Sequence, residues 1–242
     1  MDNPSKHVLA SELSVAWSNL SALEVLESAL ARFGEDKMAF VSSFGAESAV
    51  LLSLAARISP DLKIIFIETG FHFDETQRYA EQLIDRLGLT RVVRVSIDPI
   101  TRKRIDPDQR LHQVNPDLCC HIRKVEVLDR ALKGLNGWVS GQKRYQDQMR
   151  AGVELLEFDS ERDCFKVNPL AHWTAKRIEG YFQGYGLPRH PLIASGYSSI
   201  GCWPCTSPVK AGESVREGRW RGQAKTECGL HRPLRHQQGG MS

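Results

Sequence analysis

Several features that would assign this sequence to a class of protein are missing from it. Its 242 residues contain no apolar run that could cross a bilayer, because the longest runs, such as residues 63–67, have only the length of a strand. Residues 1–6 lead into an amphipathic stretch, so no signal peptide is visible. The net charge of +3 is too small for a general nucleic-acid binder. We therefore expect a cytoplasmic protein that binds neither a membrane nor nucleic acid.

The usual phosphate-binding motifs are also absent. The chain has neither the Gly-Lys-Ser/Thr ending of a Walker loop nor a G-x-G-x-x-G turn. Residues 37–41 instead predict a buried strand, which runs through a small-residue loop at 42–48 into a helix that ends near Arg57. Small residues let backbone N–H groups approach an anion, and a helix N-terminus adds positive potential. The segment is a candidate phosphate loop, with a plain strand-to-helix turn as the alternative.

Strand and helix patterns alternate along the chain. We predict strands at 63–68, 91–97 and 138–140, a helix at 74–87, and a helix that opens at the double cysteine and continues through Leu132. Asp74 is the expected N-cap of the helix at 74–87, and Gly88 follows its last turn. The alternation favours an α/β fold with a doubly wound, mostly parallel sheet. Ligands of such sheets bind outside the carboxyl ends of the strands.

The remaining segments are less regular. We predict an amphipathic helical lead-in at 11–32, a polar loop at 98–115, a hairpin with strands at 155–158 and 165–167, and a helix at 174–183. The last ~40 residues show little apolar periodicity, which predicts a metal-pinned loop region with a mobile tail.

The six cysteines offer a metal site and a spare thiol. Cys119 and Cys120 are adjacent, while Cys202 and Cys205 have a C-x-x-C spacing. Adjacent helical side chains point ~100° apart, which is awkward for a single tetrahedral zinc ion but suits different corners of an iron–sulfur cube. We therefore favour a [4Fe–4S] cluster, with zinc and a disulfide as alternatives. Cys164 has no partner at metal spacing and is expected to be structural.

Cys228 is then the candidate reactive thiol. Its basic neighbours Lys225, His231 and Arg232 would stabilise a thiolate, and the alternative is an inert exposed cysteine. Basic residues outnumber acidic ones from Cys202 to the end of the chain. Beside a thiol and a metal motif, this excess indicates an anionic substrate, whereas alone it would indicate a solvated surface.

Five motifs, taken together, resemble the assimilatory sulfonucleotide reductases. They are Ser42-Ser43-Phe44-Gly45-Ala46-Glu47, Cys119-Cys120-x-Ile122-Arg123-Lys124, Gly201-Cys202-x-Pro204-Cys205-Thr206, residues 216–220 and Glu227-Cys228-Gly229-Leu230-His231. They are most similar to the iron–sulfur branch that reduces adenosine 5′-phosphosulfate (APS). The first motif resembles the phosphate loop of the ATP pyrophosphatases, so the resemblance implies an adenine nucleotide alpha-hydrolase-like fold. It divides the chain into a nucleotide-binding α/β domain, 1–200, and a C-terminal segment, 201–242.

The resemblance also implies a mechanism. Cys228 would attack the sulfur of APS as a thiolate, releasing AMP and leaving an S-sulfocysteine. Thioredoxin or a glutaredoxin would then release sulfite. Cys119, Cys120, Cys202 and Cys205 would hold the cluster, which would position and tune Lys124 rather than carry electrons. The family's dimers and tetramers imply a homo-oligomer.

Substrate contacts follow from the same motif matches. The expected substrate-binding residues are Ser42, Ser43, Gly45, Lys124, Arg144, Arg150, Arg216, Arg219 and His231. Lysine and arginine suit sulfate and phosphate oxygens. Two residues depart from the family pattern: Lys143 replaces a common arginine, and Asp147 stands where serine is usual. The extra carboxylate is unhelpful near a phosphate unless it points away.

Three other functions compete with this interpretation. The same chemistry could act on 3′-phosphoadenosine 5′-phosphosulfate (PAPS). An ATP pyrophosphatase-type enzyme that activates a nucleobase for thiolation could carry a cluster of its own. A non-enzymatic redox sensor would need neither Cys228 nor the arginines.

Overall fold

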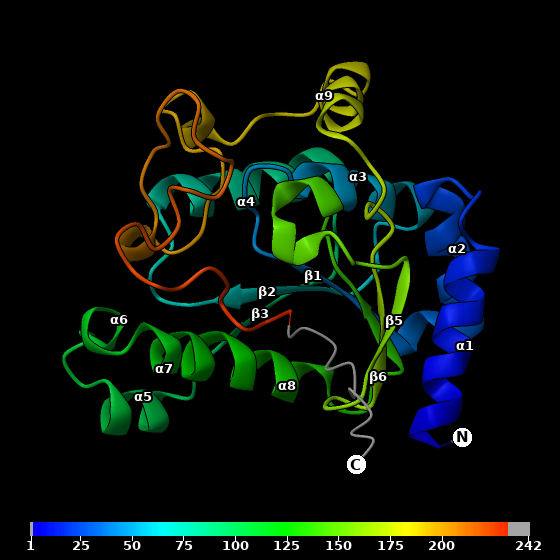
Figure 1. Cartoon of the computed structure of the whole chain (residues 1–242), viewed down its shortest axis with the longest axis horizontal. Helices are drawn as coiled ribbons and strands as arrows, with labels where there is room; N and C mark the ends of the chain where they lie inside the picture. Colours follow the sequence, from blue (N-terminus) through cyan, green and yellow to red (C-terminus); the bar gives the residue numbers. More distant parts are fainter. Residues whose placement is uncertain (1, 232–242) are drawn as a thin grey trace, which may run out of the picture.

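One six-stranded sheet organises the computed structural model, which describes residues 2–231 (Figure 1). Its strands are β1 (Met38–Ser42), β2 (Ile64–Glu68), β3 (Val92–Ser96), β4 (Gly137–Val139), β5 (Leu156–Asp159) and β6 (Cys164–Val167). Their order is β3-β2-β1-β4-β6-β5, and all neighbours are parallel except the hairpin β5–β6. The predicted α/β, doubly wound, mostly parallel sheet is confirmed.

Helices cover both faces of the sheet (Figure 1). They are α1 (Asn3–Ala16), α2 (Ala22–Phe33), α3 (Ser48–Ile58), α4 (Asp74–Leu87), α5 (Pro99–Ile105), α6 (Leu111–Val114), α7 (Pro116–Cys120), α8 (Glu126–Leu132) and α9 (Ala175–Gly184). Side chains alternate along a strand, so Phe40 of β1 packs beneath α2, α3, α4 and α9, while Ala39 packs against α8. A π-helical turn at His121–Val125 joins α7 to α8, so the double cysteine ends the first segment of one long helix.

The predicted helical lead-in at 11–32 consists of two helices, and the first of them begins earlier, at Asn3. Ser21 ends the connection between them with a capping box: its backbone N–H donates to Glu24 Oε2 at 2.7 Å, and its hydroxyl accepts from the Glu24 N–H at 3.3 Å. The N-cap of α4 is Phe73, and Asp74 is the first helical residue, where a carboxylate still favours the helix dipole. Gly88 adopts the left-handed conformation expected of it.

The expected loop at 98–115 contains two short helices. Asp98 caps α5 by accepting from the Thr101 N–H at 2.8 Å. Asp106 follows α5, is buried, and accepts from the Leu111 N–H at 2.9 Å as α6 begins. Its other oxygen accepts from Arg123 Nη2 at 2.6 Å, which ties this region to the cysteine helix. Local capping and one buried ion pair therefore order a segment that carries few apolar residues.

From α9 to residue 231, the chain returns across the carboxyl ends of the strands without forming another helix of α type (Figure 1). It contributes two 3-10 turns, at Pro191–Ile193 and Trp203–Cys205, and a bridge between Thr206 and Arg219. The predicted mobile tail and Arg232 lie outside the described residues. Within residues 2–231, no helix is both long enough and apolar enough to cross a membrane.

His190 fastens this returning chain to α4. Its ring nitrogen Nε2 lies 3.0 Å from Thr76 Oγ1, and Nδ1 accepts from the Leu192 N–H at 3.2 Å. Its ring also packs edge-on against Tyr79 at 4.9 Å. Burial lowers the pKa of His190 from 6.5 to about 4, because the imidazolium would lose its water and its accepting nitrogen.

We predict that His190 contributes to the acid sensitivity of the fold. Because its folded pKa lies below its unfolded pKa, the unfolded chain binds more protons between pH 6.5 and 4. The contribution of His190 to the free energy of unfolding is complete above pH 6.5. It is lost as the pH falls toward 4 and is about 2 kcal/mol smaller at pH 5. Urea unfolding at pH 7.5 and pH 5 should show that His190→Gln loses less stability than wild type over this interval, whereas the exposed control His7→Gln matches wild type. Equal losses in wild type and His190→Gln would contradict the prediction.

Candidate functional site

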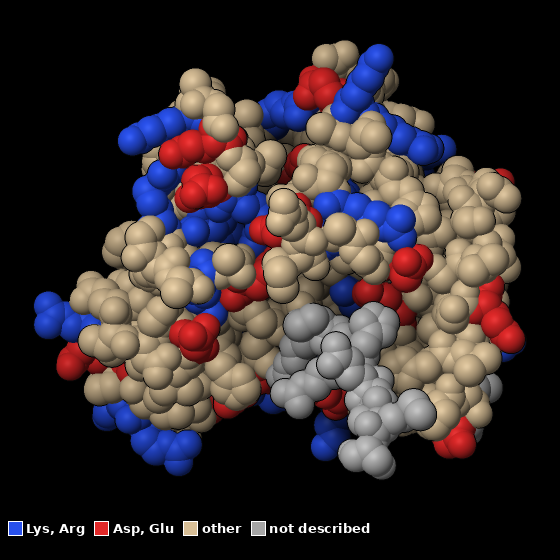
Figure 2. Space-filling model, viewed as in Figure 1, with Lys and Arg blue, Asp and Glu red and all other residues tan. Residues whose placement is uncertain are grey.

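A cavity of about 210 Å³ lies at the carboxyl edge of the sheet and is lined by most of the residues predicted to act. In Figure 2 basic side chains gather in a hollow on the face of the molecule shown there. The predicted residues that line the cavity are Ser42, Ser43, Gly45, Lys124, Arg150, Cys202, Arg216, Arg219, Cys228 and His231. Residues that are far apart in the sequence, from Ser42 to His231, therefore meet in one pocket.

The candidate phosphate loop connects β1 to α3 along one wall of this cavity. Phe44 replaces the glycine of the related motif and has a φ of +48°, a conformation that glycine adopts more easily. Its fully buried ring packs 4.8 Å from Phe66, which offsets the strain. Gly45 lies so close to the Ile200 carbonyl that a Cβ would approach it to 3.3 Å. The loop is thus fixed against the chain that returns from α9.

Glu47 lines the same cavity and is held by partners that the sequence did not reveal. The Nζ of Lys143 lies 2.8 Å from Glu47 Oε2, and Gln146 Nε2 donates to the same oxygen at 2.7 Å. Tyr145 donates to the other oxygen. Burial works to raise the pKa of Glu47, but Lys143 and these hydrogen bonds outweigh it, so the pKa is lowered. Lys143, which replaces a common arginine, is therefore a buried counter-ion of Glu47.

Two cations face the cavity without a carboxylate partner in the described part of the chain. The Lys124 ammonium is buried, and three thiol groups, led by Cys202, outweigh its burial and raise its pKa. The Arg219 guanidinium lies 4.5 Å from the Trp220 ring and against Gly201, where a Cβ would come within 2.3 Å of it. Gly201 is therefore required for Arg219 to reach the pocket. Lys124 and Arg219 carry positive charge that is available to an anion.

Two other cations of the cavity already have an anion. Glu227 Oε1 accepts from Arg150 Nε at 2.9 Å and lies 2.7 Å from Nη2, while Glu227 Oε2 lies 3.0 Å from Arg216 Nη2. Asp147 Oδ2 is 3.3 Å from Arg216 Nε, so the carboxylate that departs from the family pattern points toward the site and not away from it. Glu227 therefore occupies the position between the two arginines that an oxyanion would take.

Cys228 is the partly exposed thiol of the site. It packs against Cys120, Cys205 and Trp220. The expectation that basic neighbours stabilise its thiolate is not supported by their placement: Lys225 forms an ion pair with Asp117, and His231 stacks on Trp138 at 5.5 Å. Burial is the main cause, and nearby cations the lesser one, that holds the pKa of His231 well below its ordinary value. Its ring is therefore neutral near pH 7.

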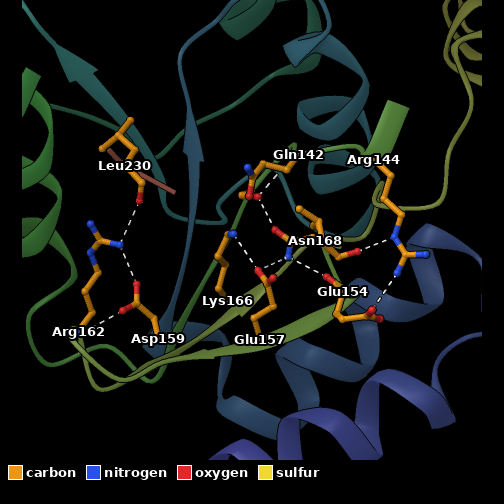
Figure 3. A network of polar contacts seen from close by, with 11 residues as sticks. Gln142, Arg144, Glu154, Glu157, Asp159, Arg162, Lys166, Asn168 and Leu230 are labelled. Carbon is orange, nitrogen blue, oxygen red and sulfur yellow. Dashed lines mark hydrogen bonds and ion pairs between the residues drawn. The ribbon is translucent and has the colours of Figure 1, made fainter. Parts of the chain in front are cut away.

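Arg144 is the predicted substrate residue that the structure does not bring to the cavity. Its Nε donates to the Val153 carbonyl at 2.7 Å, and its Nη2 donates to Glu154 at 3.0 Å (Figure 3). The preceding residue, Lys143, lines the pocket in its place. The expectation that Arg144 contacts a substrate phosphate is therefore not supported by its position.

The four cysteines of the candidate metal site line one small enclosed cavity together. Burial raises the pKa of Cys119 to about 12 and that of Cys120 to about 11, while Lys124 and the hydrogen bond between Cys202 and Thr69 overcome burial and lower the pKa of Cys202. Among residues 2–231, no three metal-binding side chains are arranged to hold a single metal ion. Four thiols are a ligand set that could hold an iron–sulfur cluster, and His112 lines the same cavity. Cys164 lies elsewhere, buried against α8.

The sheet has a nucleotide alpha-hydrolase-like fold, and the match to reductases makes the chain an oxidoreductase. The profile of the phosphoadenosine phosphosulfate reductase domain matches residues 37–208. The chain therefore belongs to the phosphoadenosine phosphosulfate reductase family. It is 44% identical over 222 residues to the adenosine 5′-phosphosulfate reductase of Mesorhizobium japonicum, covering 92% of this chain and 87% of that one.

Two other similar proteins are named after PAPS and not after APS. The phosphoadenosine 5′-phosphosulfate reductase of Gloeobacter violaceus is 41% identical over 90% of this chain and 92% of its own. A crystal structure of the Candida auris phosphoadenylyl-sulfate reductase, in a phosphate complex, superposes with a TM-score of 0.69 at 25% identity, covering 83% of this chain and 96% of that one. The Candida glabrata FMN adenylyltransferase, with a TM-score of 0.54 at 15% identity over 91% of this chain and 85% of that one, shares the fold.

We predict that Glu227 competes with small anions for Arg150 and Arg216. Glu227→Gln removes the negative charge that neutralises both arginines, so AMP used as a probe should bind about tenfold more tightly, which corresponds to about 1.4 kcal/mol. Titration calorimetry at low ionic strength measures the change. Glu217→Gln removes a carboxylate that accepts from Ser214 and, among residues 2–231, forms no ion pair with Arg150 or Arg216, so it should leave the affinity for AMP unchanged. An unchanged affinity in Glu227→Gln would contradict the competition.

Proposed function

We propose that this oxidoreductase reduces APS to sulfite and AMP in assimilatory sulfate reduction, with thioredoxin or a glutaredoxin as the electron donor. The observation that supports this most directly is the meeting of three features in one cavity: the thiol of Cys228, the loop between β1 and α3, and the cations Lys124 and Arg219 that have no ion-pair partner among residues 2–231. A thiol, a nucleotide-type loop and available positive charge are what attack on a sulfonucleotide requires. The curated relatives named after APS support the choice of substrate.

In the first proposed step, the Cys228 thiolate attacks the sulfur of APS. A bond forms between Sγ and that sulfur, the bond from sulfur to the bridging oxygen breaks, and AMP leaves with the electron pair. Negative charge grows on the bridging and sulfate oxygens, where Lys124 and Arg219 would stabilise it. Arg150 and Arg216 could add to this stabilisation once the substrate replaces Glu227 between them. Ser42, Ser43 and Gly45 would hold the AMP phosphate.

In the second proposed step, a thiolate of the donor attacks Sγ of Cys228. The bond between the two sulfurs of S-sulfocysteine breaks, and sulfite leaves with the electron pair. The second donor thiol then displaces Cys228, so the donor ends as a disulfide and supplies two electrons. Such a displacement brings the attacking and leaving sulfurs to opposite sides of Sγ. Cys228 also lines a second cavity, of about 630 Å³, which supports access from a side other than the substrate pocket.

We also propose that Cys119, Cys120, Cys202 and Cys205 hold a [4Fe–4S] cluster. Their shared cavity supports it, because four thiolates are the usual ligands of such a cluster. When bound, the cluster would position and tune Lys124, which lines the same cavity. We place the reaction in the cytoplasm, where the donor and the thiols stay reduced.

We predict that Cys228→Ser abolishes anaerobic sulfite release from APS, because an alcohol does not form the S-sulfo intermediate. The control Cys164→Ala removes the remaining cysteine outside the four-cysteine group and should keep its activity. The assay compares APS with PAPS in the presence of reduced thioredoxin, since the Gloeobacter relative is named after PAPS. Faster release from PAPS would overturn the choice of APS, and turnover by Cys228→Ser would overturn the mechanism. AMP formation from ATP would instead support the thiolation-type enzyme.

We predict that protein purified without oxygen contains about four iron and four sulfide per chain. Elemental analysis and the visible absorption of the cluster measure this, and Cys119→Ser should lose both, whereas Cys164→Ala should retain them. One zinc per chain, or a metal-free protein whose mass is lower by the two hydrogens of a disulfide, would refute the cluster.

A further inference from the structure

Two residues outside the five motifs, Arg162 and Trp138, contact the segment that carries Cys228. Arg162 Nη1 donates to the Leu230 carbonyl at 3.1 Å, as Figure 3 shows. The ring of His231 stacks on Trp138 with an interplanar angle of 16°. The Leu230 side chain packs into the apolar layer beneath the sheet. Two consecutive residues just after the thiol are therefore anchored to the fold through their backbone, an aromatic ring and an apolar side chain.

Two aspartates fix the orientation of the Arg162 guanidinium that donates to the Leu230 carbonyl. Its Nε donates to Asp129 Oδ1 at 2.7 Å and its Nη1 donates to Asp159 Oδ2 at 2.7 Å. Only 3% of its side chain is exposed. The planar guanidinium thus cannot turn without breaking two charge-assisted hydrogen bonds. This residue presents Nη1 to the Leu230 carbonyl in a preset orientation, which is a different role from neutralising the acidic residues of the turn after β5.

Trp138 is a rigid platform for the same segment. It lies in β4 and is completely buried. Arg162 and Lys166 lie 5.9 Å and 5.8 Å from its ring, and Glu157 Oε2 accepts from Lys166 Nζ at 2.8 Å. The ring contacted by His231 is therefore surrounded by side chains that are themselves held in place.

Little chain separates this anchor from the thiol. Gly229 alone lies between Cys228 and Leu230, and it has a φ of +84° that other residues rarely adopt. On the other side, Glu227 is held by Arg150 and Arg216. The thiol is consequently fixed on both sides within a segment that has neither helix nor strand.

We propose that Arg162 and Trp138 are positioning residues for Cys228, holding its thiol at the attack distance from the substrate sulfur. This inference rests on the proposed function for its kinetic part only. A displacement of a reacting group by about 1 Å can cost a factor of ~10² in rate. Loss of the anchor should therefore slow the chemical step more than it weakens nucleotide binding.

The test compares Arg162→Met and Arg162→Lys with wild type. Methionine removes the donor and the charge, whereas lysine keeps the charge without the planar fork, so it should rescue only in part. The control is Arg177→Met, which removes an exposed arginine that lies 4.4 Å from a different tryptophan, Trp173, and lines neither of the two cavities that Cys228 lines. All variants carry the full chain and are compared at a temperature at which each is folded.

The primary readout does not require reductase activity. Alkylation of Cys228 by iodoacetamide, followed by peptide mass spectrometry, should be at least fivefold faster in Arg162→Met, and amide exchange of residues 226–231 should rise. The control should match wild type in both measurements. If both are unchanged in the Arg162 variants, the anchor is refuted. If Arg162→Met does not fold, Arg162→Lys decides, because it keeps the charge beside Asp159 and Asp129.

The kinetic readout separates positioning from simple stability. Formation of S-sulfocysteine in a single turnover should slow at least tenfold in Arg162→Met, while the affinity for AMP changes less than twofold. Equal losses in rate and in AMP affinity would indicate general damage and would overturn the positioning role. If wild type forms no S-sulfocysteine, the proposed function fails, but alkylation and exchange still test the anchor.

Discussion

Burial of several positive charges at one edge of the sheet is the constraint on which the site depends. Lys124, Lys143 and Arg150 are each buried, and Arg216 and Arg219 lie beside them. A buried cation without a partner costs several kcal/mol, so each needs an anion or an orienting contact. Glu47 forms an ion pair with Lys143, and Glu227 forms ion pairs with Arg150 and Arg216. Lys124 lies near thiol groups instead. The positions of the carboxylates thus follow from the need to keep these cations in place.

This arrangement separates two kinds of cation. Lys143 and Glu47 form a closed pair, supported by Tyr145 and Gln146, that fixes the loop between β1 and α3. Arg150 and Arg216 share a carboxylate that lies next to the thiol in the chain. A substrate oxyanion can take the place of that carboxylate without creating an unpaired charge on either arginine. The exchange would link anion binding to the position of Cys228, because Glu227 and Cys228 move as neighbours.

The class of sheet and the motif residues that line the cavity could be predicted from sequence, because they follow from short-range patterns. Buried strands such as β2 are continuous apolar runs, and the motif residues follow the ends of strands. Helices α5 and α6 were missed because capping by Asp98 and Asp106 orders them without an apolar stripe. The break near Ser21 did have a signal, the Ser-x-x-Glu capping box, but apolar spacing continues across it.

The rest of the site depends on contacts between distant parts of the chain, which no local pattern encodes. Arg162 lies in the turn of a hairpin and reads as a solvated charge, yet the structure buries it against Leu230, 68 residues away. Arg144 and Lys143 are adjacent, and only the direction of the chain after β4 decides that Lys143 enters the cavity while Arg144 pairs with Glu154. The resemblance to known reductases selects the right loop but not the residue within it.

The placement of the thiol on an irregular segment has a physical reason if the proposed two-step chemistry holds. A nucleophile needs a fixed geometry for the first step, and a helix or strand would supply it, but a protein donor must then reach the same sulfur from another direction. A segment fixed by a few side-chain contacts meets both needs, because breaking one or two hydrogen bonds costs only a few kcal/mol whereas unravelling an element costs much more. Glu227 on one side and the Arg162–Trp138 anchor on the other differ in this respect. The first contact is open to exchange with an anion, while the second is backed by two aspartates and a buried ring, so the segment would open from its Glu227 side and hinge at Gly229.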